Sequence, residues 1–244
     1  MKILITGLHG TVAPVVATHA ALEGHIVVPL DRDLIDIDNE QVLDNFIKEV
    51  NPDFIFHIGM GSIVFTRFLV RAAKKYHIKF LYTSTVMVFD GNGQGPFDPS
   101  IVPTPIGEYG KYKYESEQII LDTLKDAYIV RLGWQIGNNT TGNQMIAQLK
   151  QEYLEKGYNE ASEDVYLACS FITESAKAIV SIIKEKPGIY HIDQNHHLST
   201  ADILRYLKSI HPWITPKIIK SQPYNNQMKD DKLTIQSLED TNKG

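Results

Sequence analysis

The sequence predicts an α/β protein with a Rossmann-type, doubly wound parallel sheet and a small mixed α/β C-terminal part. Short β-rich runs alternate with helical patterns as far as residue 132, and this alternation is typical of parallel strands joined by crossover helices. A glycine-containing turn joins the first strand to the first helix, and the alternation ends after Trp134. We therefore expect a Rossmann domain over 1–135, a smaller region interleaved with it over 136–235, and a flexible tail over 236–244.

Each expected strand is a short apolar or β-branched run, and each expected helix combines helical periodicity with signals at its ends. Gly24 is a C-terminal signal for the first helix, and Asn51-Pro52 ends the second. The expected strands are 2–6, 26–30, 53–58, 80–85, 127–132 and 188–192. The expected helices are 11–23, 39–50, 62–76, 107–124, 143–155, 171–184 and 200–210.

Composition excludes several function classes. The 244 residues carry a net charge of −5 with a pI of about 6.0, which does not favour nucleic-acid binding. No apolar run approaches the roughly 20 residues of a membrane span, and the apolar N-terminal run is too short for a signal peptide. The single Cys169 cannot form an intramolecular disulfide, and no Cys/His cluster has zinc-ligand spacing. We expect a cytoplasmic protein without a metal site.

The turn Gly7-Leu8-His9-Gly10-Thr11-Val12-Ala13 follows the first strand and opens the first helix. This is the setting of a dinucleotide-binding turn, in which Gly7 allows the tight turn and Gly10 allows a pyrophosphate to approach backbone N–H groups. The N-terminus of the helix also favours anions. The turn, including His9 and Thr11, is therefore predicted to bind a cofactor. A plain strand–helix turn that uses glycine is the alternative.

The second strand ends at Leu30-Asp31-Arg32. An acid at this position commonly accepts hydrogen bonds from the adenosine ribose, whereas an arginine can meet a 2′-phosphate. Asp31 favours NAD and Arg32 permits NADP, so both cofactors stay open. A solvated charged turn is the alternative.

Tyr109 and Lys113 stand four residues apart, downstream of Ser84-Thr85. Residues at this spacing share one face of a helix. A lysine beside a tyrosine favours the phenolate, so we expect the pKa of Tyr109 to fall below its usual value of about 10. The pair then serves as a proton donor and acceptor near neutral pH. The spacing alone also fits a surface pair.

The glycine turn, Ser84-Thr85 and Tyr109-x-x-x-Lys113, in this order, resemble the extended short-chain dehydrogenase/reductase superfamily. Residues 84–91, 105–117 and 131–134 are similar to motifs of its dTDP-4-dehydrorhamnose reductase branch. The resemblance covers essentially the whole chain and is most specific in the first 135 residues.

The resemblance implies roles for the matching residues. Tyr109 would protonate a carbonyl oxygen as hydride arrives from the nicotinamide, with Thr85 bonded to the same oxygen and Lys113 on the nicotinamide ribose. Trp134 would line the sugar pocket. The remaining implied positions are Val86 and Met87 on the substrate side, Asp36 and Ile37 near the adenine, and Ile58 and Gly59 along the cofactor.

The chain departs from the family after its third strand, at His57-Ile58-Gly59-Met60-Gly61, where family members carry a longer acidic segment. His57 and Met60 are expected to be core substitutions. Gln222 replaces an arginine that could meet the nucleotide diphosphate. Val86 and Met87 stand where related dehydratases place acids, and apolar side chains cannot move protons, so dehydration is disfavoured.

The favoured function is an NAD(P)-dependent reductase of a 4-keto-6-deoxy sugar nucleotide, with a small-molecule substrate and a possible homodimer. One alternative is a sugar-nucleotide epimerase that holds NAD tightly. Another is a non-catalytic, NAD(P)-binding regulatory module, which the shortened segment motivates. A purely structural Rossmann-like protein is a third.

Overall fold

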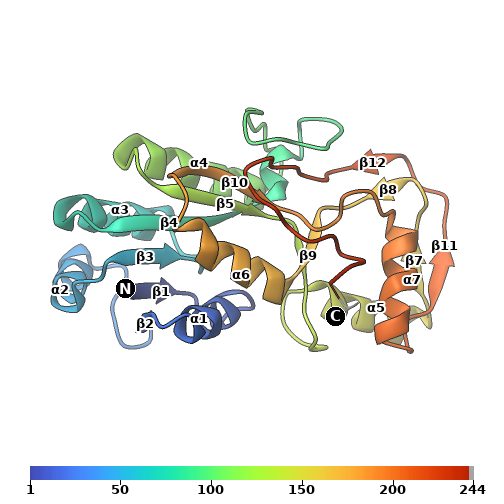
Figure 1. Cartoon of the computed structure of the whole chain (residues 1–244), viewed down its shortest axis with the longest axis horizontal. Helices are drawn as coiled ribbons and strands as arrows, with labels where there is room; N and C mark the ends of the chain where they lie inside the picture. Colours follow the sequence, from blue (N-terminus) through green and yellow to red (C-terminus); the bar gives the residue numbers. More distant parts are fainter. Residues whose placement is uncertain (242–244) are drawn as a thin grey trace.

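A six-stranded parallel sheet forms the larger part of the molecule (Figure 1). The structure, a computed structural model, describes residues 1–241. The strand order is β10-β5-β4-β3-β1-β2. The strands are β1 (Lys2–Thr6), β2 (Ile26–Leu30), β3 (Phe54–His57), β4 (Lys79–Thr85), β5 (Tyr128–Leu132) and β10 (Gly188–Ile192). The doubly wound parallel sheet predicted from the alternating pattern is confirmed.

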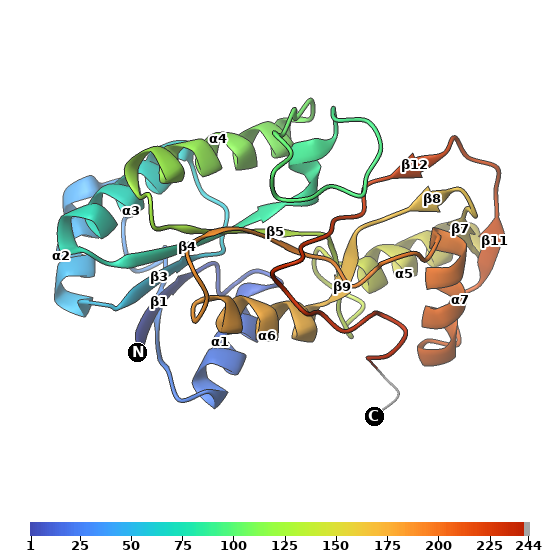
Figure 2. The same cartoon turned by 45° about the horizontal axis from the view of Figure 1, so that its top comes forward.

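Helices cover both faces of this sheet (Figure 2). On one face lie α1 (Ala13–Leu22) and α6 (Ile172–Ile182); on the other lie α2 (Glu40–Val50), α3 (Ile63–Tyr76) and α4 (Glu108–Thr123). Two apolar cores result, one on each side of the sheet. The chain leaves β1 toward β2 and returns to β3 on the other side of β1, so the strand order reverses between β1 and β3. Ligands of open α/β sheets bind at such a reversal.

The smaller part is built on α5 (Met145–Lys156) and α7 (Thr200–Ile210), which share a third apolar core. Short parallel strand pairs join its loops. The pairs are β6 (Trp134–Ile136) with β9 (Cys169–Phe171), β7 (Asn159–Ala161) with β11 (Pro216–Ile218), and β8 (Val165–Tyr166) with β12 (Tyr224–Asn225). Strands of two or three residues are too short to leave a sequence pattern, and the sequence did not predict them.

Two helices begin two residues later than predicted, and each has a local cause. The first begins at Ala13 rather than at residue 11, because the preceding residues form the glycine turn and Pro14 occupies the first helical turn. The other, α5, begins at Met145 rather than at residue 143. The side-chain oxygen of Gln144 caps it by accepting the Ile146 N–H at 2.8 Å.

The expected flexible tail is wrong for residues 236–241. Leu238 is buried in the core of the smaller part, and its N–H donates to the Gln194 carbonyl. The Gln194 amide in turn donates to the Gln236 carbonyl and to the Thr241 hydroxyl. A single apolar residue in a polar stretch gave no periodic signal. Residues 242–244 lie outside the described part.

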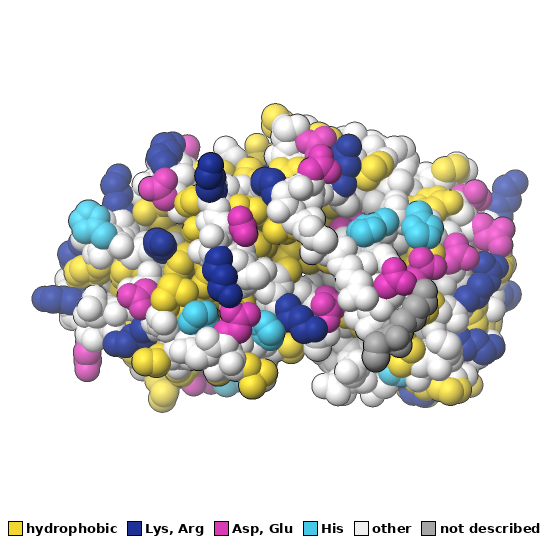
Figure 3. Space-filling view, viewed as in Figure 1, with side chains coloured by type: hydrophobic (Ala, Val, Ile, Leu, Met, Phe, Trp, Pro, Cys, Tyr) yellow, Lys and Arg dark blue, Asp and Glu magenta, His cyan; other side chains and the backbone are white. Residues whose placement is uncertain are grey.

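Positive and negative side chains are interleaved on the face shown in Figure 3, without a basic patch. Among the described residues, no helix is long and apolar enough to cross a membrane.

Candidate functional site

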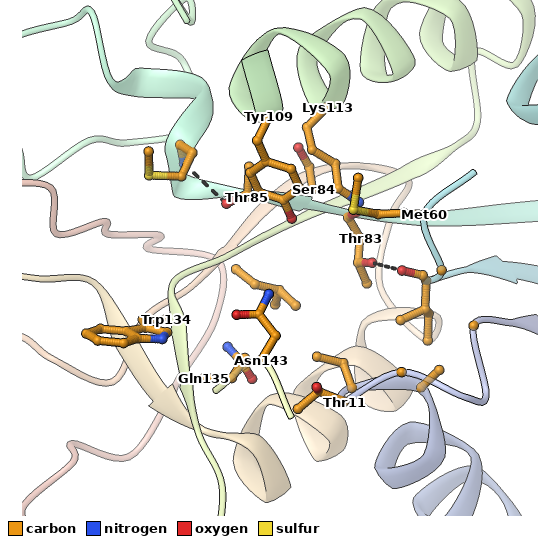
Figure 4. A pocket seen from close by; sticks show the side chains of 18 of the residues that line it. Thr11, Met60, Thr83, Ser84, Thr85, Tyr109, Lys113, Trp134, Gln135 and Asn143 are labelled. Carbon is orange, nitrogen blue, oxygen red and sulfur yellow. Dashed lines mark hydrogen bonds between the residues drawn. The ribbon is translucent and has the colours of Figure 1, made fainter. Parts of the chain in front are cut away.

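A cavity of about 740 Å³ opens at the carboxyl ends of the central strands, between the two parts of the chain. Figure 4 shows Tyr109 and Lys113 projecting from α4, with Trp134, Gln135, Asn143 and Thr11 on the opposite side. The predicted site residues that line it are Gly7, His9, Gly10, Thr11, Arg32, Ile37, Ile58, Gly59, Thr85, Val86, Met87, Tyr109, Lys113 and Trp134.

Two predicted residues, Asp31 and Asp36, do not line the cavity. Asp31 lies 3.6 Å from the His9 ring and accepts the Asp33 N–H. Asp36 accepts the Asp38 N–H within its own turn. Arg32, by contrast, borders the cavity. His9, Asp31 and Asp33 also bring three possible metal-ligand atoms within 4.8 Å, on a largely exposed charged turn.

The glycine turn fits a dinucleotide, because Gly7 and Gly59 touch so closely that neither position has room for a side chain. Gly7 has a φ of +84°, and a Cβ there would lie 2.4 Å from the Gly59 Cα. The ends of β1 and β3 therefore touch through bare backbone at the strand-order reversal. The Gly10 N–H donates to the Gly7 carbonyl at 2.8 Å, which closes the turn in front of α1. This leaves space and N–H groups for an anion at the helix N-terminus.

The buried side chain of Thr6 holds the ends of β1 and β3 together through hydrogen bonds. The Thr6 hydroxyl oxygen accepts the N–H groups of Ile58 and Gly59 at 3.1 and 3.0 Å, and lies 3.0 Å from His57 Nδ1. The other ring nitrogen of His57 contacts the Thr66 hydroxyl at 3.2 Å. Burial, and secondarily the charge of Lys113, lowers the pKa of His57 to about 3. His57 is thus a neutral core residue, which confirms that expectation.

Met60 is not a core residue, so that expectation is wrong. It is 55% exposed and lines the cavity, because the connection from β3 to α3 is too short to fold over it. The connection is held on both sides: the Thr83 hydroxyl donates to the Ile58 carbonyl, and the Gly61 N–H donates to the Tyr112 hydroxyl at 3.2 Å.

Tyr109, Thr85 and Lys113 meet at the cavity from two elements. Tyr109 stands on the first turn of α4, with its phenol beside Thr85 at the end of β4 (Figure 4). Lys113, one turn further along α4, is only 3% exposed, and its ammonium donates to the Thr83 carbonyl at 2.9 Å. The Lys113 Nζ lies 5.9 Å from the centre of the Tyr109 ring.

The pKa of Tyr109 changes in the direction opposite to the prediction. Tyr109 is 44% exposed overall, but its hydroxyl points into the cavity (Figure 4). Loss of water there raises its pKa, repulsion from Tyr112 adds to this, and the neighbouring Thr85 hydroxyl opposes it. Lys113 is directed at Thr83 rather than at the phenol. Burial lowers the pKa of Lys113 to about 8, and the Glu117 carboxylate opposes that change.

Several cavity residues were not predicted, and they include Thr83, Gln135 and Asn143. Thr83 precedes Thr85 by two residues on β4, so both share one face of the strand, and this spacing was a readable signal. Gln135 is a polar residue inside an apolar strand. Its amide N–H donates to the Gly133 carbonyl at 3.0 Å, while its Oε1 and the Ser84 hydroxyl are buried without a partner among residues 1–241.

A glycine turn at the strand-order reversal, opposite a Tyr–Lys pair on α4, defines a class of protein. The chain is a member of the extended short-chain dehydrogenase/reductase superfamily, a class of NAD(P)-dependent oxidoreductases. Within that class it belongs to the family described as RmlD substrate binding domain, whose family model matches residues 62–209.

Two curated relatives show how far sequences diverge within the family. The spore coat polysaccharide biosynthesis protein SpsK of Bacillus subtilis is 22% identical over 214 residues, which cover 80% of this chain and 74% of SpsK. A dTDP-4-dehydrorhamnose reductase of Mycolicibacterium smegmatis is 24% identical over 215 residues, which cover 78% of this chain and 63% of that protein.

Solved structures share the fold. A dTDP-4-dehydrorhamnose reductase of Bacillus anthracis, in complex with NADP, superposes with a TM-score of 0.84 at 20% identity, covering 98% of this chain and 96% of the other. A dTDP-glucose 4,6-dehydratase of Bacillus anthracis, in complex with NAD, gives 0.75 at 18% identity, covering 95% and 88%.

Proposed function

We propose that this protein is an NAD(P)-dependent reductase of a 4-keto-6-deoxy sugar nucleotide. The observation that carries the proposal is the meeting of Thr85, Tyr109 and Lys113 at a cavity whose opposite wall is the glycine turn. Relatives named dTDP-4-dehydrorhamnose reductase support the substrate class.

The residues of the chain have distinct roles in this reaction. The bound cofactor supplies the hydride to the carbonyl carbon. Thr85 and Tyr109 donate hydrogen bonds to the carbonyl oxygen, where negative charge develops. Tyr109, which holds its proton at neutral pH, passes that proton to the oxygen as the C–O π bond breaks. The Lys113 ammonium stabilises the resulting phenolate until water returns the proton.

The position of Arg32 supports NADP(H) as the cofactor. Arg32 borders the cavity, whereas Asp31 is engaged with His9 and Asp33. A guanidinium suits a phosphate, because it offers several donors and a permanent charge.

The test is to incubate the protein with a dTDP-4-keto-6-deoxy sugar and NADPH that carries deuterium in place of the transferred hydrogen. We expect stoichiometric NADPH oxidation and deuterium at C4 of the product. Interconversion of sugar epimers without NADPH consumption would instead identify an epimerase. Cofactor binding without turnover of any keto sugar would identify a non-catalytic module.

A further inference from the structure

A buried carboxylate lies one helical turn beyond Lys113. Glu117 is fully buried on α4, four residues after Lys113, so both side chains lie on the face of the helix that packs against the sheet. A buried charge is costly unless it is paired, so a carboxylate in this place requires an explanation.

Arg131 of β5 holds this carboxylate in one orientation. Its Nε donates to one Glu117 oxygen at 3.0 Å and its Nη2 to the other at 2.7 Å, a bidentate pair. Its remaining nitrogen donates to Nε2 of His191 at 3.3 Å. The other ring nitrogen of His191 donates to the Phe97 carbonyl at 3.1 Å, and the guanidinium packs on the Phe89 ring.

Lys113 has few groups that favour its charge. Its ammonium donates to one carbonyl, that of Thr83, and lies 4.7 Å from the centre of the Tyr82 ring. The other ionisable groups that face it from α4 and β3 are Tyr109, Tyr112 and His57, and none of them is a carboxylate. Among the described residues, Glu117 is the carboxylate whose charge acts on Lys113.

We propose that Glu117 is a positioning residue that keeps the buried Lys113 ammonium protonated, and that Arg131 fixes the Glu117 carboxylate in the orientation this requires. The charge of Lys113 is measurable without any reaction. The consequence for catalysis rests on the proposed reductase activity, because Lys113 must be charged to stabilise the Tyr109 phenolate.

The direct test is an NMR titration of protein labelled with ¹³C at the lysine ε-carbon. Lys113 is assigned as the resonance missing from Lys113→Met. We expect Glu117→Gln to lower the Lys113 titration midpoint by about one pH unit or more, the usual effect of a nearby opposite charge. Glu115→Gln, the same change on the exposed side of α4, should leave the midpoint unchanged. A midpoint unmoved in folded Glu117→Gln would refute the proposal.

A second variant is needed in case Glu117→Gln does not fold, because that change leaves Arg131 buried without its partner. Glu117→Gln/Arg131→Gln replaces the ion pair with two amides and removes both charges. A smaller downward change in the Lys113 midpoint is expected, because loss of the more distant Arg131 charge offsets part of the effect of losing Glu117, and an unchanged or raised midpoint would overturn the proposal. If the midpoint moves but the wild-type protein reduces no keto sugar, the proposed function fails while this inference stands.

Catalysis gives a separate readout. Lys113 is the lower-pKa member of the pair, so wild-type kcat/KM should decline as the pH rises through about 8. In Glu117→Gln this decline should begin at lower pH, with NADPH affinity at pH 6 unchanged. A uniform loss of activity at every pH would show a merely structural role.

Discussion

Tyr109 keeps its proton because its hydroxyl lies in the enclosed part of the cavity, where an anion would lose its hydration. The same loss of water lowers the pKa of Lys113, because it again favours the neutral form. The two effects leave an acid ready to donate and a cation that needs support from Glu117. A Tyr–Lys spacing read from sequence cannot show this, because it does not report which groups are buried.

Arg32 should decide the preference for NADP(H). Since its side chain borders the cavity and carries a permanent charge, Arg32→Ala should weaken NADPH binding at least about tenfold, as expected for the loss of a charge-assisted hydrogen bond. NADH binding should change little. Fluorescence titration with both cofactors checks this, and equal losses for both would place Arg32 elsewhere on the nucleotide.

Gly7 should be indispensable for cofactor binding. Gly7→Ala adds a Cβ at 2.4 Å from the Gly59 Cα, in addition to backbone strain of about 1 kcal/mol for a left-handed residue. Gly24 has nearly the same φ, +82°, but open space around it, so Gly24→Ala carries the strain without the clash. We expect Gly24→Ala to bind NADPH like the wild type and Gly7→Ala to lose binding. Normal binding by Gly7→Ala would contradict the close contact of β1 and β3.

At the scale of elements, the sequence predicted the sheet and its helices because the strands are continuous apolar runs and the helices between them carry end signals. Trp134 was predicted on one wall of the site, but its neighbours there, Gln135, Asn143, Leu167 and Ala168, were not. This wall depends on contacts between segments distant along the chain, such as Trp134 with Ala168. Likewise, the side-chain cap at Gln144 and the anchor at Leu238 are single residues without a repeating pattern.

Leu238 should anchor the C-terminal segment to the smaller part. Because it is 1% exposed in the α5–α7 core, Leu238→Ala should lower the free energy of unfolding by about 2–5 kcal/mol. Leu154→Ala removes the same atoms from a side chain that is 72% exposed, and should change the free energy of unfolding little. Urea denaturation compares the two. Equal effects would mean that residues 236–241 contribute nothing to the core.

At the scale of the whole molecule, buried histidines couple folding to pH. Burial lowers the pKa values of His57 and His191 to about 3, whereas each titrates near 6.5 when exposed. The unfolded chain therefore binds more protons between these values, and stability falls as the pH drops through this window. Asp193, whose pKa burial raises to about 7, acts in the opposite direction, losing stability as the pH rises.

The contribution of His57 can be isolated. His57→Asn removes a titrating group while keeping a polar side chain in the same core position. Its unfolding free energy should fall less than that of the wild type between pH 7 and pH 5. Urea titrations at both pH values measure this, and identical pH dependence in the two proteins would mean that His57 does not stay neutral.

The most direct measurement for the account as a whole is single-turnover reduction of a 4-keto-6-deoxy sugar nucleotide by Tyr109→Phe and Tyr112→Phe. Both variants lose one hydroxyl from the same end of α4, but Tyr109 lines the cavity with Thr85, whereas the Tyr112 hydroxyl accepts the Gly61 N–H. We predict that Tyr109→Phe slows the hydride-transfer step by about 10²–10⁴-fold with NADPH affinity retained, as expected for a lost general acid. Tyr112→Phe should stay within about tenfold of the wild type, as expected for a single lost hydrogen bond. Equal rates for Tyr109→Phe and the wild type would contradict the role of Tyr109 as the acid.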